Sequence, residues 1–195
     1  MNITFDQYKK EFISSLEKIP KKDVEKFVRG LINLKKKKGR LFFLGVGGSA
    51  ANCTHAVNDF RKLCGIESYS PIDNAAELTA RINDEGWDTS FSNWLGVSKL
   101  SRKDAVFIMS VGGGNLKKKV SVNLIKAIQF AKKKKSKVFG IVSRDGGYTL
   151  KNADYTIHIP VDDGKLVTPI SEAMQAVMWH YIVSHPNTQI NKTKW

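Results

Sequence analysis

Apolar residues recur along this chain with two spacings, that of amphipathic helices and that of buried strands. The first part carries two helical stripes, one over 4–19 and a second that begins at about Asp23. Four apolar runs are predicted strands, at 40–44, 105–109, 137–142 and 155–159, and a fifth, short strand is predicted near 68–70. Helical segments are predicted between and after them, at about 50–64, 74–82, 88–98, 119–134 and 169–184.

Strands that alternate with helices predict βαβ units and a parallel sheet covered on both faces. The fold class is therefore α/β, a flavodoxin-like or Rossmann-like three-layer sandwich with two helices in front of it. We expect one domain over 1–195, with a helical pair at 1–36, an α/β core at 37–186 and a polar, frayed tail at 187–195. Ligands bind such sheets at the carboxyl ends of the strands. The loops at 45–49, 110–115 and 143–147 should therefore converge on one pocket.

The segment 41–59, LFFLGVGGSAANCTHAVND, carries the strongest chemical signal. A glycine-rich turn and Ser49 bring unpaired N–H groups to a helix N-terminus, an arrangement that binds anions. His55 and Asp59 are four residues apart, so they share one face of that helix. They lie off its apolar stripe, which argues against a simple core role for His55, although a surface ion pair is the alternative. Together these features indicate chemistry on a phosphorylated small molecule.

Composition narrows the class of protein. The chain is 42% apolar and 26% charged, and no apolar run approaches the roughly 20 residues of a membrane span. Cys53 and Cys64 lie eleven residues apart on one predicted helix, too far for a disulfide, which indicates reduced thiols in the cytoplasm. The net charge of +14 comes largely from lysine runs at 35–38, 117–119 and 132–135. These runs fall near helix C-termini without interleaved aromatics, which disfavours nucleic-acid binding and leaves steering of anionic substrates.

Five segments in register resemble the sugar isomerase (SIS) domain and, within it, the sedoheptulose-7-phosphate isomerases, also called phosphoheptose isomerases. They are GVGGS at 45–49, THAVNDF at 54–60, INDEGWDTSF at 82–91, SRDGG at 143–147 and the final helix from 172 to 180. The resemblance covers nearly the whole chain. It implies an aldose–ketose isomerase that converts sedoheptulose 7-phosphate to a heptose 7-phosphate through an ene-diol, in heptose biosynthesis. It also implies a homotetramer that packs through its N-terminal helices and lines its sites from more than one subunit.

The resemblance also assigns chemical roles to residues. It places the acid–base pair at Asp59 and His180, and a divalent metal, commonly zinc, at His55, Asp59, Glu172 and His180. Glu172 stands where the family has glutamine. About 12 Å of helix separates Glu172 from His180, so a helix break or a neighbouring subunit would have to bring both to one ion. An acid in the first turn of a helix is the alternative role of Glu172.

The same resemblance implies a set of substrate and phosphate contacts: Gly47, Gly48, Ser49, Asn83, Asp84, Ser110, Gly112, Gly113, Asn115 and Ser121. Several positions depart from the family pattern. Val46 replaces an asparagine, and the second phosphate loop reads SVGGGN where the family has STSGNS, followed by about three inserted residues. Asn83 and Asp84 fit a turn or cap equally well. The altered loop favours an alternative function, a non-catalytic phosphosugar-binding regulatory protein, whereas the retained histidines and Asp59 favour an enzyme.

Overall fold

The computed structural model describes residues 3–192. Its strands are β1 (Leu41–Leu44), β2 (Ser68–Tyr69), β3 (Ala105–Ser110), β4 (Lys137–Val142) and β5 (Tyr155–His158). Its helices are α1 (Phe5–Glu17), α2 (Lys21–Lys36), α3 (Gly48–Cys64), α4 (Ala75–Glu85), α5 (Ser90–Val97), α6 (Val122–Lys133), α7 (Gly147–Asn152) and α8 (Val167–Ser184), with a short 3-10 turn η1 (Pro71–Asp73).

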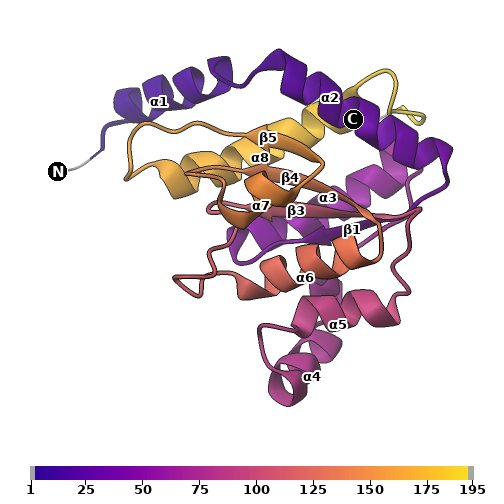
Figure 1. Cartoon of the computed structure of the whole chain (residues 1–195). Helices are drawn as coiled ribbons and strands as arrows, with labels where there is room; N and C mark the ends of the chain where they lie inside the picture. Colours follow the sequence, from indigo (N-terminus) through magenta and orange to yellow (C-terminus); the bar gives the residue numbers. More distant parts are fainter. Residues whose placement is uncertain (1–2, 193–195) are drawn as a thin grey trace.

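The five strands form one parallel sheet in the order β2-β1-β3-β4-β5. Helices α2, α3 and α8 cover one face, and α5 and α6 cover the other, with α4 beyond α5 (Figure 1). This arrangement confirms the predicted three-layer α/β sandwich with two leading helices. The loops that follow the carboxyl ends of the strands lie at one edge of the sheet, and the C-terminal ends of α2 and α6 lie at the opposite edge (Figure 1).

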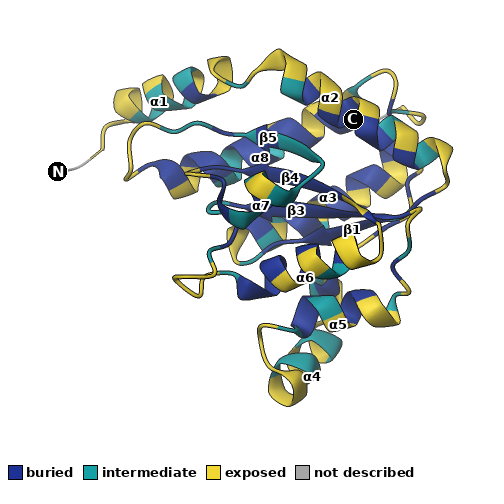
Figure 2. Ribbon diagram, in the orientation of Figure 1, coloured by how far each residue is buried: buried dark blue, intermediate teal, exposed yellow. Residues whose placement is uncertain are grey.

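Side chains of successive strand residues point to opposite faces of the sheet and pack into two separate hydrophobic cores, one on each face. On the α2–α3–α8 face, Phe43 and Phe107 pack edge to face with ring centroids 4.7 Å apart, and Phe27 packs on Phe107 at 5.3 Å. On the other face, Trp94 of α5 packs edge to face on Phe42 at 5.6 Å. The three central strands, β1, β3 and β4, are buried almost throughout (Figure 2). Rigid strands of this kind fix the positions of the loops at their ends.

Three helices differ from the sequence prediction at an end or in their presence, and the first is α4, which runs to Glu85 and not to about 82. Helix α6 begins at Val122, three residues later than expected, because 115–120 forms a small hairpin closed by hydrogen bonds between Asn115 and Val120. Helix α7 was not predicted, because its six residues are too few to show a helical repeat. The hairpin accounts for the residues that separate the second glycine loop from its helix.

The predicted fraying of 187–195 is wrong for the part that the structure describes. Thr188 is buried and its hydroxyl donates a hydrogen bond to the carbonyl of Ile182. The N–H of Ile190 donates to the carbonyl of Leu63 at 2.8 Å, and the side chain of Asn191 donates to Lys62. These bonds tie the segment after α8 to the end of α3, and residues 193–195 lie outside the described part. No helix within 3–192 is long and apolar enough to cross a membrane.

Candidate active site

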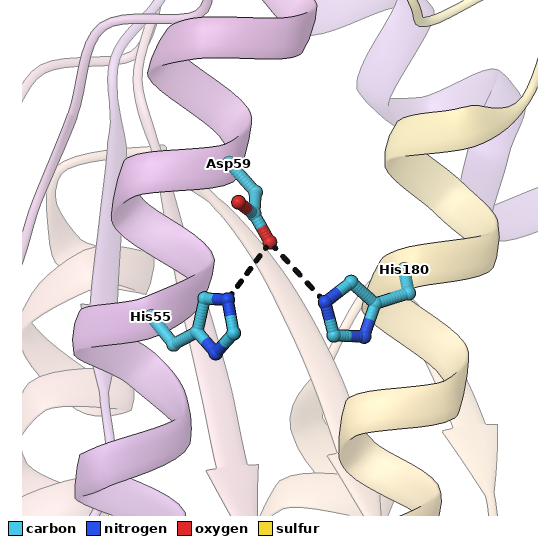
Figure 3. Close-up of side chains that lie close together, drawn as sticks. All are labelled: His55, Asp59 and His180. Atoms are coloured by element: carbon cyan, nitrogen blue, oxygen red, sulfur yellow. Dashed lines mark ion pairs between the residues drawn. The ribbon is translucent and has the colours of Figure 1, made fainter. Parts of the chain in front are cut away.

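Two histidines and one aspartate meet in the seam between helices α3 and α8 (Figure 3). The Nε2 atoms of His55 and His180 each lie 3.5 Å from Oδ2 of Asp59. One potential ligand atom from each of the three residues lies within 4.8 Å of the other two. The structure therefore brings together three of the four residues that were expected to form the catalytic and metal site. Helix α8 needs no break to do this.

Burial differs sharply within this cluster. The Asp59 side chain is only 7% exposed, whereas those of His55 and His180 are 56% and 49% exposed. Asp59 lies off the apolar stripe of α3 but is covered by α8, which contacts α3 more extensively than any other helix does. A carboxylate at the floor with two accessible imidazoles above it can present both acid–base and ligand atoms to a bound molecule.

Two neighbours hold the Asp59 carboxylate in place. The indole N–H of Trp179 donates a hydrogen bond of 3.1 Å to Oδ2, the oxygen that faces both histidines. The side-chain amide of Asn58 donates to Oδ1 at 3.1 Å. Trp179 is 1% exposed, and its ring lies 5.3 Å from that of His55 and 4.8 Å from that of His180. Trp179 thus orients the carboxylate, and its ring packs against both imidazoles.

A buried polar network continues along the same seam toward the first glycine loop. Gln175, fully buried on α8, donates from Nε2 to the Ser49 hydroxyl at 3.0 Å and accepts from Asn52 at 2.8 Å. Ser49 is itself 1% exposed, and it is six residues, about 9 Å of helix, before His55. The network links the start of α3 to the His–Asp–His cluster.

Glu172 does not join the three-residue cluster, contrary to the expected four-residue ligand set. Its carboxylate packs against Gly48 in the first turn of α3, where a Cβ atom would lie 2.3 Å from Oε2. Only glycine at this position admits the carboxylate. The physical reason is the helical spacing, because eight residues of an unbroken α8 keep Glu172 at the level of the loop. An acid at this helix N-terminus also suits the dipole of α3.

The second and third glycine loops pack directly on each other. The carbonyl of Gly113 accepts hydrogen bonds from both the N–H and the hydroxyl of Thr149, at 2.9 and 2.8 Å. The carbonyl of Gly114 accepts from the N–H of Tyr148 at 2.8 Å. Inside the second loop, the N–H of Gly113 donates to the Ser110 hydroxyl at 3.0 Å. The carbonyl side of this loop is therefore anchored on α7.

Several donors near the start of α6 have no acceptor among residues 3–192. They are the backbone N–H groups of Gly112, Gly114, Val122 and Asn123 and the buried side-chain amide of Asn123. Ser121, the residue before α6, has a left-handed backbone with φ 50° and makes no capping bond with its side chain. Unpaired donors at a helix N-terminus attract an anion.

The expected convergence of all three loops on one pocket holds only in part. A hollow of about 280 Å³ is lined by the second and third loops, with Lys117 and Lys151 at its rim. Neither the first glycine loop nor the His–Asp–His cluster lines that hollow. The side-chain oxygen of Asn115 accepts a hydrogen bond from the N–H of Lys118, which fixes the hairpin turn.

Asn83 and Asp84 lie apart from the cluster within one chain. They occupy the last turn of α4, are exposed, and are hydrogen-bonded to each other at 2.7 Å. Helix α4 lies beyond α5, on the side of the sheet opposite α8 (Figure 1). Within one chain, Asn83 and Asp84 therefore do not lie beside the His–Asp–His cluster, where their predicted contact with sugar hydroxyls would be made.

Three polar or aromatic residues of the site were not singled out in the sequence: Asn52, Gln175 and Trp179. The sequence did contain a pattern that indicates Asn52, because Ser49, Asn52 and Asp59 lie at helical spacing on one face of α3. Trp179 follows the apolar pattern of α8, so nothing in its local sequence separates it from the core. Only the packing of α8 on α3 reveals its role as a donor.

The sandwich, its two leading helices and the cluster between α3 and α8 define an SIS-domain isomerase fold. The structure of the phosphoheptose isomerase GmhA from Neisseria gonorrhoeae superposes with a TM-score of 0.78 over 92% of each chain, at 21% sequence identity. Phosphoheptose isomerases from Helicobacter pylori are similar in sequence. One from strain P12 is 29% identical over 180 residues, 89% of this chain and 85% of that protein. One from strain HPAG1 is 30% identical over 151 residues, 74% of this chain and 72% of that protein.

No family model matches the chain. The relatives nevertheless place it plainly: the chain belongs to the phosphoheptose isomerase family, and it is an isomerase.

Proposed function

We propose that this protein interconverts an aldose and a ketose that carry a phosphate, with sedoheptulose 7-phosphate and a heptose 7-phosphate as the reacting pair. The meeting of His55, Asp59 and His180 across two helices is the observation that supports it most directly. The names of the relatives point to the same substrate class. Heptose biosynthesis in the cytoplasm fits the two cysteines, which are buried and unbridged.

The reaction moves a proton between C1 and C2 through an ene-diol, which needs a base at carbon and an acid at oxygen. Asp59 is the proposed base, and the indole of Trp179 keeps its carboxylate oriented. His180 is the proposed acid, because an imidazole exchanges protons near neutral pH and its ring is half exposed. His55 and His180 lie on either side of the Asp59 carboxylate (Figure 3).

The phosphate is proposed to bind at the start of α6, where the unpaired donors gather. The Ser110 hydroxyl accepts from Gly113 and still has its own hydrogen to donate. Ser49, Gly47 and Gly48 at the start of α3, with Gly112, Gly113, Asn115 and Ser121 in the second loop, complete the proposed contacts. Because Glu172 already fills the first turn of α3, the second loop is the better anion site of the two.

The donor set of the cluster fits a divalent metal, zinc best. Two imidazole nitrogens and one carboxylate oxygen are a common set in catalytic zinc sites, which keep one position open. Ligands of a tetrahedral zinc ion are roughly 3.3–3.6 Å apart, and the two nitrogen–oxygen distances here are 3.5 Å. His55, Asp59 and His180 would hold the ion. When bound, it would supply Lewis-acid polarisation of the substrate carbonyl in place of proton donation by His180, because a metal-bound imidazole nitrogen carries no proton.

The assembly is proposed to be a homotetramer packed through the N-terminal helices. Helix α1 buries only Ser15 and exposes large apolar side chains, among them Phe5, which is 78% exposed. A hollow of about 260 Å³ on α1 is lined mainly by Phe5, Tyr8, Phe12 and Ile13. A second copy would cover this surface, and a neighbouring copy is the proposed source of Asn83 and Asp84 for the site.

Purified protein incubated with sedoheptulose 7-phosphate is expected to form an aldose 7-phosphate, read by ¹H NMR as an aldehyde-derived anomeric signal. Deuterium from D₂O should enter at C2 of the aldose, because the base exchanges the proton taken from C1 with solvent before it protonates C2 of the ene-diol. Metal analysis before the assay should find one divalent ion per chain. No product with or without added zinc would refute the isomerase, and a tightly bound but unconverted sugar phosphate would support the regulatory alternative.

Replacing Trp179 with phenylalanine should weaken zinc binding by about 10- to 100-fold, because the ligand Asp59 loses the donor that orients it. Calorimetric titration of the metal-free protein measures this. Trp94→Phe is the matched control, since Trp94 is buried in the core on the opposite face of the sheet, where it packs on Phe42. Equal zinc affinity in the wild type and in Trp179→Phe would show that the indole does not position the carboxylate.

A further inference from the structure

Lysine and arginine residues gather along the amino-terminal edge of the sheet, opposite the glycine loops. This basic edge comprises the residues that precede or begin three adjacent strands: Lys35, Lys36, Lys37, Lys38, Arg40, Lys99, Arg102, Lys103, Lys132, Lys133, Lys134, Lys135 and Lys137. Strands β1, β3 and β4 are neighbours, and Leu41, Ala105 and Lys137 stand in register. Runs that are far apart in sequence therefore lie side by side, at the right of Figure 1.

A buried carboxylate ties the three basic segments together. Asp104, 3% exposed, accepts hydrogen bonds from the backbone and guanidinium of Arg40, and from the N–H and hydroxyl of Ser101. Its own carbonyl accepts from the Ser136 hydroxyl at 2.7 Å, just before β4. Gly39 packs on the chain beside it, because a Cβ there would lie 2.0 Å from the carbonyl oxygen of Lys103. The positions of the cations are thus built into the fold.

Most of these cations have no carboxylate to neutralise them. The three acids nearby are engaged: Asp104 with Arg40 and Ser101, Asp154 with Lys137, and Glu67 with Tyr69. Across residues 3–192, no carboxylate oxygen lies within 4 Å of the charged groups of Lys36, Lys37, Lys38, Lys99, Arg102, Lys103, Lys132, Lys133, Lys134 or Lys135. Each helix C-terminus contributes only about half a negative charge, so the ends of α2, α5 and α6 offset a small part of this charge.

The basic edge is hollowed where its segments meet. A hollow of about 430 Å³ is lined by Lys36 and Lys37 at the end of α2, Arg102 and Lys103 before β3, and the half-buried ring of Tyr155. That ring stacks on Phe139 with centroids 4.6 Å apart, which fixes its position. A second hollow of about 200 Å³ is lined by Lys35 and Lys38, with Glu67 as its one acid.

We propose that the basic edge binds single-stranded nucleic acid. A single phosphate would engage only one of the segments, whereas a chain of phosphates can follow all three and neutralise them together. The sequence disfavoured nucleic-acid binding because no aromatic residue lies among the lysine runs, but the fold brings the partly buried ring of Tyr155 into the larger hollow beside them, and single-strand sites combine cations with aromatic rings in this way. The second glycine loop lies at the opposite edge of the sheet, and no residue of the His–Asp–His cluster lines either hollow, so a bound strand leaves the isomerase site open. This proposal does not depend on the identity of the sugar.

The test uses a fluorescein-labelled 20-nucleotide poly(U) RNA and fluorescence anisotropy with the full chain. With about five phosphates neutralised, raising monovalent salt from about 50 to 200 mM should weaken binding about 100-fold. The variant K36E/K37E/R102E/K103E should bind about tenfold or more weakly than the wild type at the lower salt. Absence of binding at that salt would overturn the proposal.

A matched variant separates this site from general charge. K10E/K22E/K26E/K165E reverses four exposed lysines outside the basic edge and changes the net charge by the same amount. Its affinity should fall less than threefold, and circular dichroism should show both variants folded. Equal losses in the two variants would overturn the proposal, as would binding to vesicles containing phosphatidylserine with none to RNA.

Discussion

Replacing Asp59 with asparagine should lower kcat/KM for the sugar phosphate by about 10³-fold or more. Asparagine keeps the shape of the side chain and an oxygen that can still accept from the Trp179 indole. It loses the negative charge that takes the proton, and general acid–base groups contribute about 10²- to 10⁴-fold to rate. A neutral amide is also a poor zinc ligand. The measurement is steady-state turnover at saturating and limiting substrate, with zinc content determined on the same sample.

Two histidines, one on α8 and one just after it, provide a matched comparison for this prediction. His180→Gln should also lose at least 10²-fold in activity, because it removes the proposed acid beside Asp59. His185→Gln changes a histidine just after the same helix, outside the cluster, and should retain near wild-type turnover. Asp59→Asn within threefold of the wild type, with an unchanged circular dichroism spectrum, would remove Asp59 from the chemistry.

The sequence allowed the fold to be predicted well because its signals are local. Continuous apolar runs located four of the five strands, and their alternation with helices required a parallel sheet. The His55–Asp59 pair was found for the same reason, since a four-residue spacing sets one helix face. The short helix α7 and the hairpin at 115–120 escaped, because each depends on a few turn residues with no repeat.

The rest of the site depends on contacts between residues that are far apart in the chain. Asp59 reads as a surface residue of α3, and only α8, some 120 residues later, makes it a buried carboxylate. Glu172 was assigned to the metal set through the family resemblance, yet its carboxylate lies against Gly48. The helical spacing had already indicated that both residues could not reach one ion from a straight helix, because an unbroken helix keeps Glu172 and His180 about 12 Å apart. Which of the two reached the cluster depended on the register of α8 against α3.

Replacing Gly113 with alanine should cost about 3 kcal/mol of folding free energy, from two causes at one position. Its φ is +65°, a left-handed conformation that costs a residue with a Cβ roughly 1 kcal/mol. In addition, the new Cβ would lie 2.0 Å from the carbonyl oxygen of Gly146, and backbone shifts of this kind cost about 1–3 kcal/mol. For a chain of this size the midpoint of thermal unfolding should fall by about 10 °C. Differential scanning calorimetry measures both quantities.

The same substitution should also weaken substrate binding, because it separates the two loops that shape the proposed phosphate site. Moving Gly113 away from Gly146 would break the bonds that Thr149 makes to the Gly113 carbonyl, and the donors near α6 would lose their alignment. KM should therefore rise more than kcat falls, since the acid–base cluster lies elsewhere, between α3 and α8. Gly164→Ala is the control, because it has no heavy atom within 4 Å of the new Cβ and should change neither stability nor KM. A Gly113→Ala protein that is as stable as Gly164→Ala would show that the two loops do not pack as the structure has them, and the anion site built on their contact would fall with it.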